Sequence, residues 1–133
     1  MPELNNNNFR TVCFFGACAA LSSKVLVSQR ISSPFIVSEI RASFALNTNR
    51  TLKLSFFVSP DPSAPVTGTP TGFDCLDEYG QVSFLTGDDE QKTVKNNSLI
   101  KEHPSWLKIF ALNADNFEHT IDAQIDIQLV SRE

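Results

Sequence analysis

The side chains that could do chemistry are few in this 133-residue sequence, which has two histidines, His103 and His119, and three cysteines. A histidine acts as an acid or a base only when a nucleophile, a carboxylate or a metal is positioned beside it. We expect His119 to be a turn residue that hydrogen-bonds the backbone and His103 to lie in a loop. Neither G-x-S-x-G nor H-E-x-x-H occurs. The sequence therefore predicts a protein that is not an enzyme and that needs no cofactor.

The cysteines do not form a metal or redox motif. Cys13 and Cys18 are separated by four residues with no histidine nearby, Cys75 is remote in the sequence, and no C-x-x-C occurs. A zinc site would need a second closely spaced pair of ligands. Three cysteines also cannot all pair within one chain. We expect buried or inert free thiols in a reducing compartment.

Acidic residues gather between positions 74 and 90, where the sequence contains no lysine or arginine. Carboxylates are suitable ligands for Ca²⁺, but the D-x-[DN]-x-[DN]-G pattern of a calcium loop is missing. A solvated acidic edge that discourages strand pairing is the favoured interpretation, and no metal is predicted. The eleven basic residues are scattered and the net charge is −4, so neither composition nor pattern favours nucleic-acid binding.

The aromatic composition bears on sugar binding. The chain has eleven Phe but only one Trp and one Tyr. Carbohydrate sites usually stack sugar rings on exposed Trp or Tyr, whose polar edge Phe lacks. A carbohydrate-binding β-sandwich module is therefore the alternative function and not the first choice.

The elements that must position these residues follow from a two-residue alternation of apolar side chains. The alternation runs over 36–46 and again over 51–58, with the turn residues 47–50 between them, which predicts a β-hairpin. The segment 106–114 is apolar on both sides except at Lys108, which is typical of a covered central strand. The segment 121–129 is the most regular half-buried strand in the chain.

The other segments complete an all-β pattern. Further strands are expected at 11–19, 24–29, 81–86 and 91–95, with a short helical turn at 73–79. The proline-rich segment 59–72 is expected to be a long surface loop. The sequence predicts a polar N-terminal arm over residues 1–10 and, over 11–133, a single antiparallel β-sandwich of about seven or eight strands, for which jelly-roll connectivity is one arrangement.

Three aromatic residues are candidates for a subunit interface: Phe57, Phe73 and Trp106. Phe57 has the opposite parity to the apolar face of its strand, so it is expected to point away from the core. Exposed aromatic area usually marks an interface. Coverage of Phe57 by the proline-rich loop is the structural alternative.

The segment 11–21 has an apolar run and a small-residue Ala-Cys-Ala that imitate a secretory signal, but it follows a polar stretch with little positive charge. It is also too short to cross a bilayer, which takes about 20 apolar residues. We expect it to form a strand pair in the mature protein and predict no membrane partner.

Four stretches together resemble small β-sandwich accessory proteins of bacteriophage virions. They are the expected hairpin 41–59 (in RASFALNTNRTLKLSFFVSP, residues 41–60), the loop SPDPSAPVTG, the turn Gly87-Asp88-Asp89 and the strand His119-Thr120-Ile121-Asp122-Ala123. The resemblance covers about residues 30–130 and is one of layout. It implies head decoration or cementing: a small homo-oligomer, often a trimer, that sits on capsid protein, with an extended terminal arm. It also implies assembly in the host cytoplasm and a location in the virion.

Overall fold

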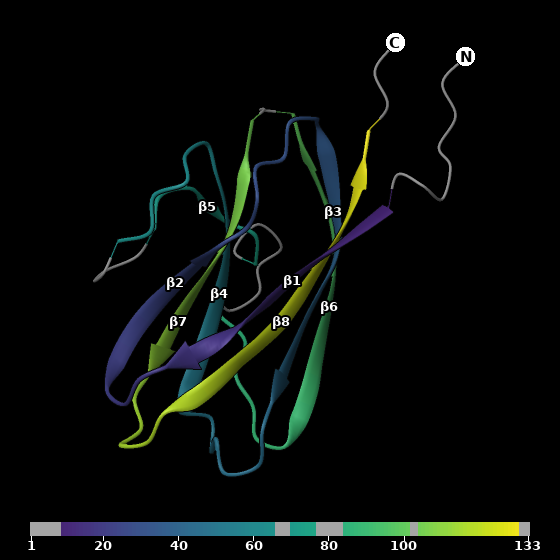
Figure 1. Ribbon diagram of the computed structural model, residues 1–133. Coiled ribbons are helices and arrows are strands. Elements are labelled where there is room, and N and C mark those ends of the chain that lie inside the picture. The colour runs from purple at the N-terminus through teal and green to yellow at the C-terminus, as the bar shows by residue number, and fades with distance from the viewer. Residues whose placement is uncertain (1–8, 66–69, 77–83, 102–103, 131–133) are drawn as a thin grey trace.

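The computed structural model describes residues 9–65, 70–76, 84–101 and 104–130. Eight strands form two antiparallel sheets of four strands, packed face to face (Figure 1). The fold is therefore a β-sandwich, as predicted. The strands are β1 (Phe9–Cys18), β2 (Ser22–Val27), β3 (Phe35–Phe44), β4 (Leu52–Ser59), β5 (Phe73–Asp74), β6 (Glu90–Ile100), β7 (Trp106–Asn113) and β8 (His119–Leu129).

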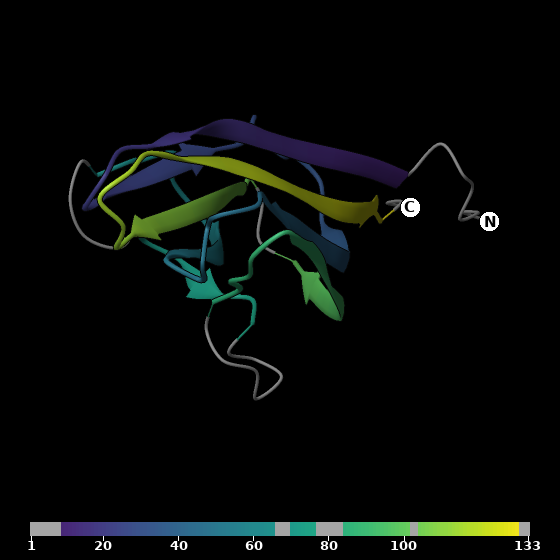
Figure 2. The same cartoon turned by 90° about the horizontal axis from the view of Figure 1, so that it is seen from below.

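The strand order is that of a jelly roll. One sheet has the order β1-β8-β3-β6 (sheet A) and the other has the order β2-β7-β4-β5 (sheet B). Most successive strands therefore alternate between the two layers, which Figure 2 shows from below, with β1 and β8 side by side in one layer. This eight-strand double-sheet arrangement defines the jelly roll. No helix long and apolar enough to cross a membrane occurs in the described part of the chain.

The predicted hairpin is wrong, because β3 and β4 lie in different sheets. The linker between them contains three residues with positive φ, Asn47, Asn49 and Arg50, and it carries the chain across the core from one layer to the other. Asparagine accepts this conformation readily. The alternation could not reveal the difference, since an arch between two sheets that share one core buries the same face of each strand as a hairpin does.

Strand β3 contains a β-bulge between Val37 and Glu39 that changes its buried face. A bulge adds one residue to one strand, so the side chains beyond it exchange faces. Val37 is buried before the bulge and Ile40 after it, whereas Ile36, which was predicted to face the core, is only half-buried. Leu46, also predicted to face the core, lies beyond the end of β3 and is 65% exposed.

The last two strands match their prediction closely. Leu107, Ile109 and Ala111 of β7 are fully buried, and β8 buries every second residue from Ile121 to Ile127. Side chains that lie two apart on a strand share a face, so both strands line the space between the sheets. One strand from each sheet, β7 and β8, thus contributes the centre of the core.

The region before β6 differs from its prediction. Phe73 and Asp74 form the short strand β5 where a helical turn was expected, Cys75 and Leu76 follow as a buried turn, and positions 77–79 lie outside the described residues. Of the strand expected at 81–86, positions 84–86 are described, and they contribute only a single bridge between Leu85 and Leu54. Strand β6 is longer than expected. In the first third, segment 11–21 holds one strand and the start of a turn, not a strand pair.

Candidate functional site

The three aromatic residues singled out from the sequence lie on sheet B. Phe57 of β4 and Trp106 of β7 are half-buried on its outer face, where Phe57 is opposite Lys108 and Trp106 is opposite Ser59. Phe73 is opposite Val58 on the edge strand β5, on the other face of the sheet, and is 43% exposed. The fold thus brings Phe57 and Trp106 together and separates Phe73 from them. Their role in an interface stays a prediction.

The loop after β4 covers part of this face by holding a buried cation. The side chain of Lys108 is fully buried, and its Nζ lies 3.2 Å from Asp61 Oδ1, 3.3 Å from Ser63 Oγ and 3.2 Å from Thr71 Oγ1. A buried ammonium group must be paired and hydrogen-bonded, so the loop closes over it. Hydrogen bonds from Ser63, Thr71 and Lys108 lower the pKa of Asp61 well below its usual range. The coverage expected of the proline-rich loop is therefore present beside Phe57.

Three apolar side chains that are more exposed than Phe73 lie at one end of the sandwich. The connections β1–β2, β3–β4 and β7–β8 meet there with residues 84–89, which precede β6, at the bottom of Figure 1, and we call this the turn end. Three of these connections each carry one large exposed side chain: Leu21 is 67% exposed, Leu46 is 65% exposed and Phe117 is 71% exposed. Exposed apolar groups that gather in one region mark contact sites. The turn end is the candidate functional site.

Backbone hydrogen bonds join the connections of the turn end into one unit. Leu21 N donates to Asp115 O at 2.9 Å, and Ala114 N donates to Thr51 O at 2.9 Å. The β3–β4 linker is bonded to the turn before β6 in the same way, since Arg50 N donates to Gly87 O at 3.2 Å. The exposed side chains therefore project from a fixed base.

Asn113 is the residue that ties the β1–β2 and β7–β8 connections together. It is almost fully buried, and its Nδ2 donates to Cys18 O at 3.1 Å, to Ala19 O at 3.3 Å and to Phe117 O at 2.8 Å. Its Oδ1 accepts a hydrogen bond from Asp115 N at 2.9 Å. Asn113 thus positions the turns that carry Leu21 and Phe117.

His119 has a structural partner at the same end. Its Nε2 lies 2.7 Å from Asp115 Oδ2, so it bonds a carboxylate and not the backbone that was expected. Hydrogen bonds from His119 and from Asn116 N lower the pKa of Asp115. This pair braces the β7–β8 turn. His103 lies outside the described residues.

The outer face of sheet A carries a network of charges. Arg41 Nη1 lies 2.7 Å from Glu39 Oε2 and 2.6 Å from Asp126 Oδ2, and Lys95 also pairs with Glu39. Because Lys95 and Arg41 donate hydrogen bonds to Glu39, its pKa is lowered, and Arg41 lowers the pKa of Asp126 in the same way. These side chains neutralise one another.

The cysteines differ in burial, and two residues of the acidic segment accept backbone hydrogen bonds. Cys18 and Cys75 are buried, and Cys13 is exposed. Burial raises the pKa of the Cys18 thiol. Of the acidic segment, Asp88 Oδ1 accepts from Asn49 N and Glu90 Oε1 accepts from Asp88 N, so both carboxylates brace turns. Among the described residues, no three His, Cys, Asp or Glu side chains gather as a metal site.

Comparison with known proteins identifies no family for this chain. No protein-family model matches the chain, and no curated protein sequence matches it. Solved structures with a similar fold include the CBM32 of AlyQ in complex with 4,5-unsaturated mannuronic acid, with 13% identity, coverage of 84% of this chain and 75% of that chain, and a TM-score of 0.48. Another is the cowpea mosaic virus top component, at 5% identity, 93% and 84% coverage, and a TM-score of 0.48. These likenesses concern the β-sandwich alone.

Sequence reasoning missed the turn end. Leu21 ends the apolar run 11–21 and Leu46 ends the alternation 36–46, so both were counted with strands, whereas Phe117 stands alone among polar turn residues. None of the three belongs to the buried face of a strand. The available signal was the isolated large apolar residue in the turn at Phe117. That signal gains meaning only when the strand order places the turns together.

Proposed function

We propose that this protein is a non-enzymatic structural protein of a virion, which decorates or cements a bacteriophage capsid through many copies of one weak contact. The observation that carries the proposal is the gathering of Leu21, Leu46 and Phe117 on bonded turns at one end of a jelly roll. The fold is compatible with this role, because jelly rolls occur in viral capsid domains, although lectin domains and cupins share it.

The energy of such a contact explains why many copies are needed. Complete burial of a Leu or Phe side chain contributes about 1.5–3 kcal/mol. Since Leu21, Leu46 and Phe117 are exposed by 67%, 65% and 71%, their burial together supplies roughly 3–6 kcal/mol. Loss of translational and rotational freedom on association costs about 4–15 kcal/mol. One contact is therefore weak, whereas symmetric copies on a shell act together.

The proposed partner is capsid protein, further copies of this chain, or both, and the proposed location is the virion. A homo-oligomer such as a trimer satisfies the requirement for repeated contacts. Neither nucleic acid nor a membrane is part of the proposal.

The test is sedimentation velocity of the pure protein over a range of concentrations, together with co-sedimentation with phage capsids. The wild type is expected to self-associate or to bind capsids. The triple variant Leu21→Ser, Leu46→Ser, Phe117→Ser is expected to lose both. The matched control is Phe9→Ser with Leu99→Ser, two exposed residues away from the turn end, and it should behave as the wild type does.

Two results would overturn this proposal. One is a wild-type protein that stays monomeric at every concentration and ignores capsids. The other is a triple variant that associates as the wild type does. Loss of association on changing Phe57 and Trp106 instead would move the contact to the outer face of sheet B.

The alternative function is carbohydrate binding. The outer face of sheet A favours it, because Gln124 and Asp122 of β8 lie beside Arg41 of β3 on an uncovered polar surface. Amides and carboxylates of this kind hydrogen-bond sugar hydroxyls. A monomer that binds on a glycan array, and loses that binding in Gln124→Ala, would favour this alternative over the virion role.

A further inference from the structure

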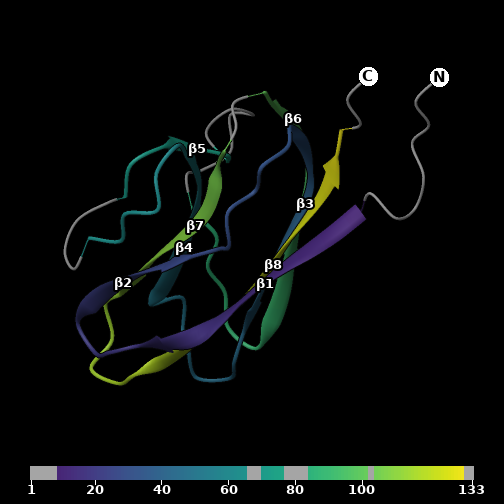
Figure 3. The same cartoon turned by 45° about the horizontal axis from the view of Figure 1, so that its top comes forward.

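A groove of about 680 Å³ opens at the end of the sandwich opposite the turn end. It lies between the start of β1, the end of β8 and the segment 28–33 that follows β2. Figure 3 shows the start of β1 and the end of β8 next to each other at this end. Binding sites for small molecules usually have volumes of about 300–1,000 Å³. The groove has the size of a ligand site.

The floor of the groove is aliphatic. The core-facing rows of β1 and β8 continue past the packed core and contribute Val12, Ile127 and Leu129, while Val27 and Ile31 form the facing wall. The lining residues that the structure describes include no aromatic ring. A floor of branched aliphatic side chains suits a flexible hydrocarbon chain, whereas sugar rings generally need an aromatic platform.

The facing wall is fixed before any ligand arrives. Ile31 and Ser105 exchange two backbone hydrogen bonds of 2.8 Å and 2.9 Å, and Ser28 N donates to Leu107 O at 2.8 Å. Leu107 N in turn donates to Ser28 Oγ at 2.9 Å. The segment is thereby bound to β7 and its preceding residue. A preformed wall lowers the entropy that binding must overcome.

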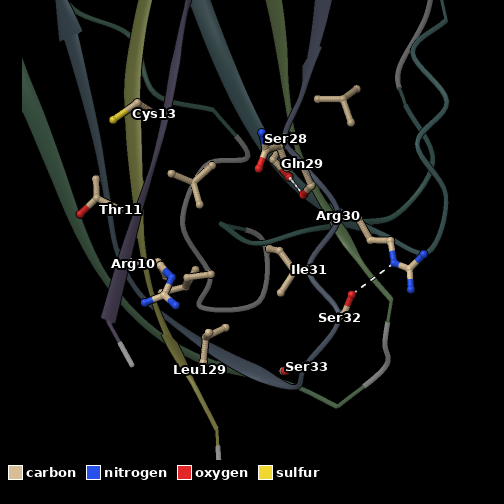
Figure 4. Close-up of a pocket in the computed structure, with 13 residues that line it drawn as sticks. Arg10, Thr11, Cys13, Ser28, Gln29, Arg30, Ile31, Ser32, Ser33 and Leu129 are labelled. Atoms are coloured by element: carbon tan, nitrogen blue, oxygen red, sulfur yellow. Dashed lines mark hydrogen bonds between the residues drawn. The ribbon is translucent and has the colours of Figure 1, made fainter. Parts of the chain in front are cut away.

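The mouth of the groove is cationic. Arg10 has the parity of the core-facing residues Val12 and Phe14, and it is placed opposite Ile127, where an apolar side chain would be expected. Figure 4 shows Arg10 and Leu129 facing the groove with Ile31 across from them, whereas Thr11 and Cys13 point away. Arg30 lies on the rim, with its Nε donating to Ser32 Oγ at 3.2 Å. A guanidinium group has five donors and readily binds a carboxylate.

The charge of the groove is opposite to that of the protein. The chain carries a net charge of −4, with fifteen acidic residues, yet among the described residues that line the groove there is no Asp or Glu. Asp126 is the nearest carboxylate in sequence to the lining residues of β8. It is bonded to Arg41 and to Thr11 Oγ1 at the outer face of sheet A. The groove therefore complements an anion attached to an apolar body.

We propose that this groove binds an aliphatic carboxylate, with the hydrocarbon chain between the floor of Val12 and Leu129 and the wall at Ile31, and the carboxylate on Arg10. The proposal is independent of the virion role, because the groove and the turn end are at opposite ends of the sandwich. Occupancy of one leaves the other accessible. The oligomeric state tests the first proposal and ligand titration tests this one.

The experiment is isothermal titration calorimetry with sodium octanoate, sodium decanoate, decyltrimethylammonium and glucuronate. We expect decanoate to bind, and affinity to rise by about fourfold for each methylene added between octanoate and decanoate. Decyltrimethylammonium and glucuronate should bind much more weakly, because the first repels Arg10 and the second cannot use the aliphatic floor.

Variants locate the site. Arg10→Gln keeps much of the side chain but removes its charge, and it should weaken decanoate binding by about tenfold or more, since hydrogen bonds to charged groups are the strong ones. Arg10→Lys should retain part of the affinity, and Ile31→Ser should remove the chain-length dependence. The control Arg50→Gln alters an arginine of the β3–β4 linker and should leave binding unchanged. Circular dichroism verifies that each variant is folded.

Several outcomes would overturn the proposal. These are the absence of decanoate binding, equal binding by wild type and Arg10→Gln, and equal binding of decanoate and decyltrimethylammonium. Glucuronate binding as tight as decanoate binding would identify a sugar-acid site instead. Competition between decanoate and self-association would assign the groove to a second copy of the chain.

Discussion

Removal of the Asn113 side chain should loosen the turn end and lower stability. Asn113→Ala deletes the amide that joins the β1–β2 and β7–β8 connections through Cys18 O, Ala19 O and Phe117 O. It also deletes the acceptor of Asp115 N. Because Asn113 is almost fully buried, water cannot readily replace these partners.

The magnitude follows from the hydrogen bonds lost. The amide supplies two N–H donors and accepts one bond, and a typical buried hydrogen bond contributes about 1 kcal/mol, so the free energy of unfolding should fall by about 3 kcal/mol. For a chain of 133 residues, 1 kcal/mol corresponds to about 4 °C in Tm. The expected fall in Tm is therefore about 12 °C.

Differential scanning calorimetry of wild type, Asn113→Ala and the control Asn97→Ala measures this effect. Asn97 is exposed on β6, so its variant should change Tm by no more than about 2 °C. Asn113→Ala should also weaken self-association, since it frees the turns that carry Leu21 and Phe117. A Tm for Asn113→Ala within about 3 °C of wild type would refute the assigned role of this amide.

Three further predictions concern other parts of the fold. Gly72→Ala should lower Tm in the same calorimeter, because Gly72 has a φ of +115° and an added Cβ would collide with Val58 O; an unchanged Tm would contradict the backbone described. Stability should be complete above the ordinary carboxyl pKa and fall as pH drops through the lowered pKa of Asp126, because the unfolded chain then binds more protons. Urea midpoints at about pH 7 and about pH 3 should differ less in Arg41→Met than in wild type, and an identical difference would count against the ion pair. Native protein should react with Ellman's reagent at Cys13 alone, and rapid reaction of all three thiols without denaturant would show that the core is not closed.

The strands that the sequence predicted best are those whose buried face follows from the alternation of their own residues. The alternation of 121–129 appears in β8 without a break, and the apolar character of 106–114 matches a central strand whose outer face is covered near Lys108. In both segments each apolar residue occupies the face that its parity requires. A regular strand carries that information in its own residues.

The errors come from features that depend on remote segments. Nothing in 36–58 states whether the second strand pairs with the first or crosses to the other sheet, since both arrangements bury the same residues. The bulge near Ser38 is likewise defined by its pairing with β6 and β8. The turn end and the groove are assembled from three or more connections and strand ends, so neither exists at the level of local sequence.

The position of β8 has a consequence for how the protein is made. It is the last strand of the sandwich in chain order, yet it lies between β1 and β3 in the middle of sheet A. A growing polypeptide therefore cannot complete that sheet until residues 119–129 have left the ribosome, and β1 lacks its partner strand until then. Pairings between such distant segments form slowly. We expect sheet A to close only after β8 has emerged, so the edge of β1 that pairs with β8 stays open in the nascent chain until that strand inserts.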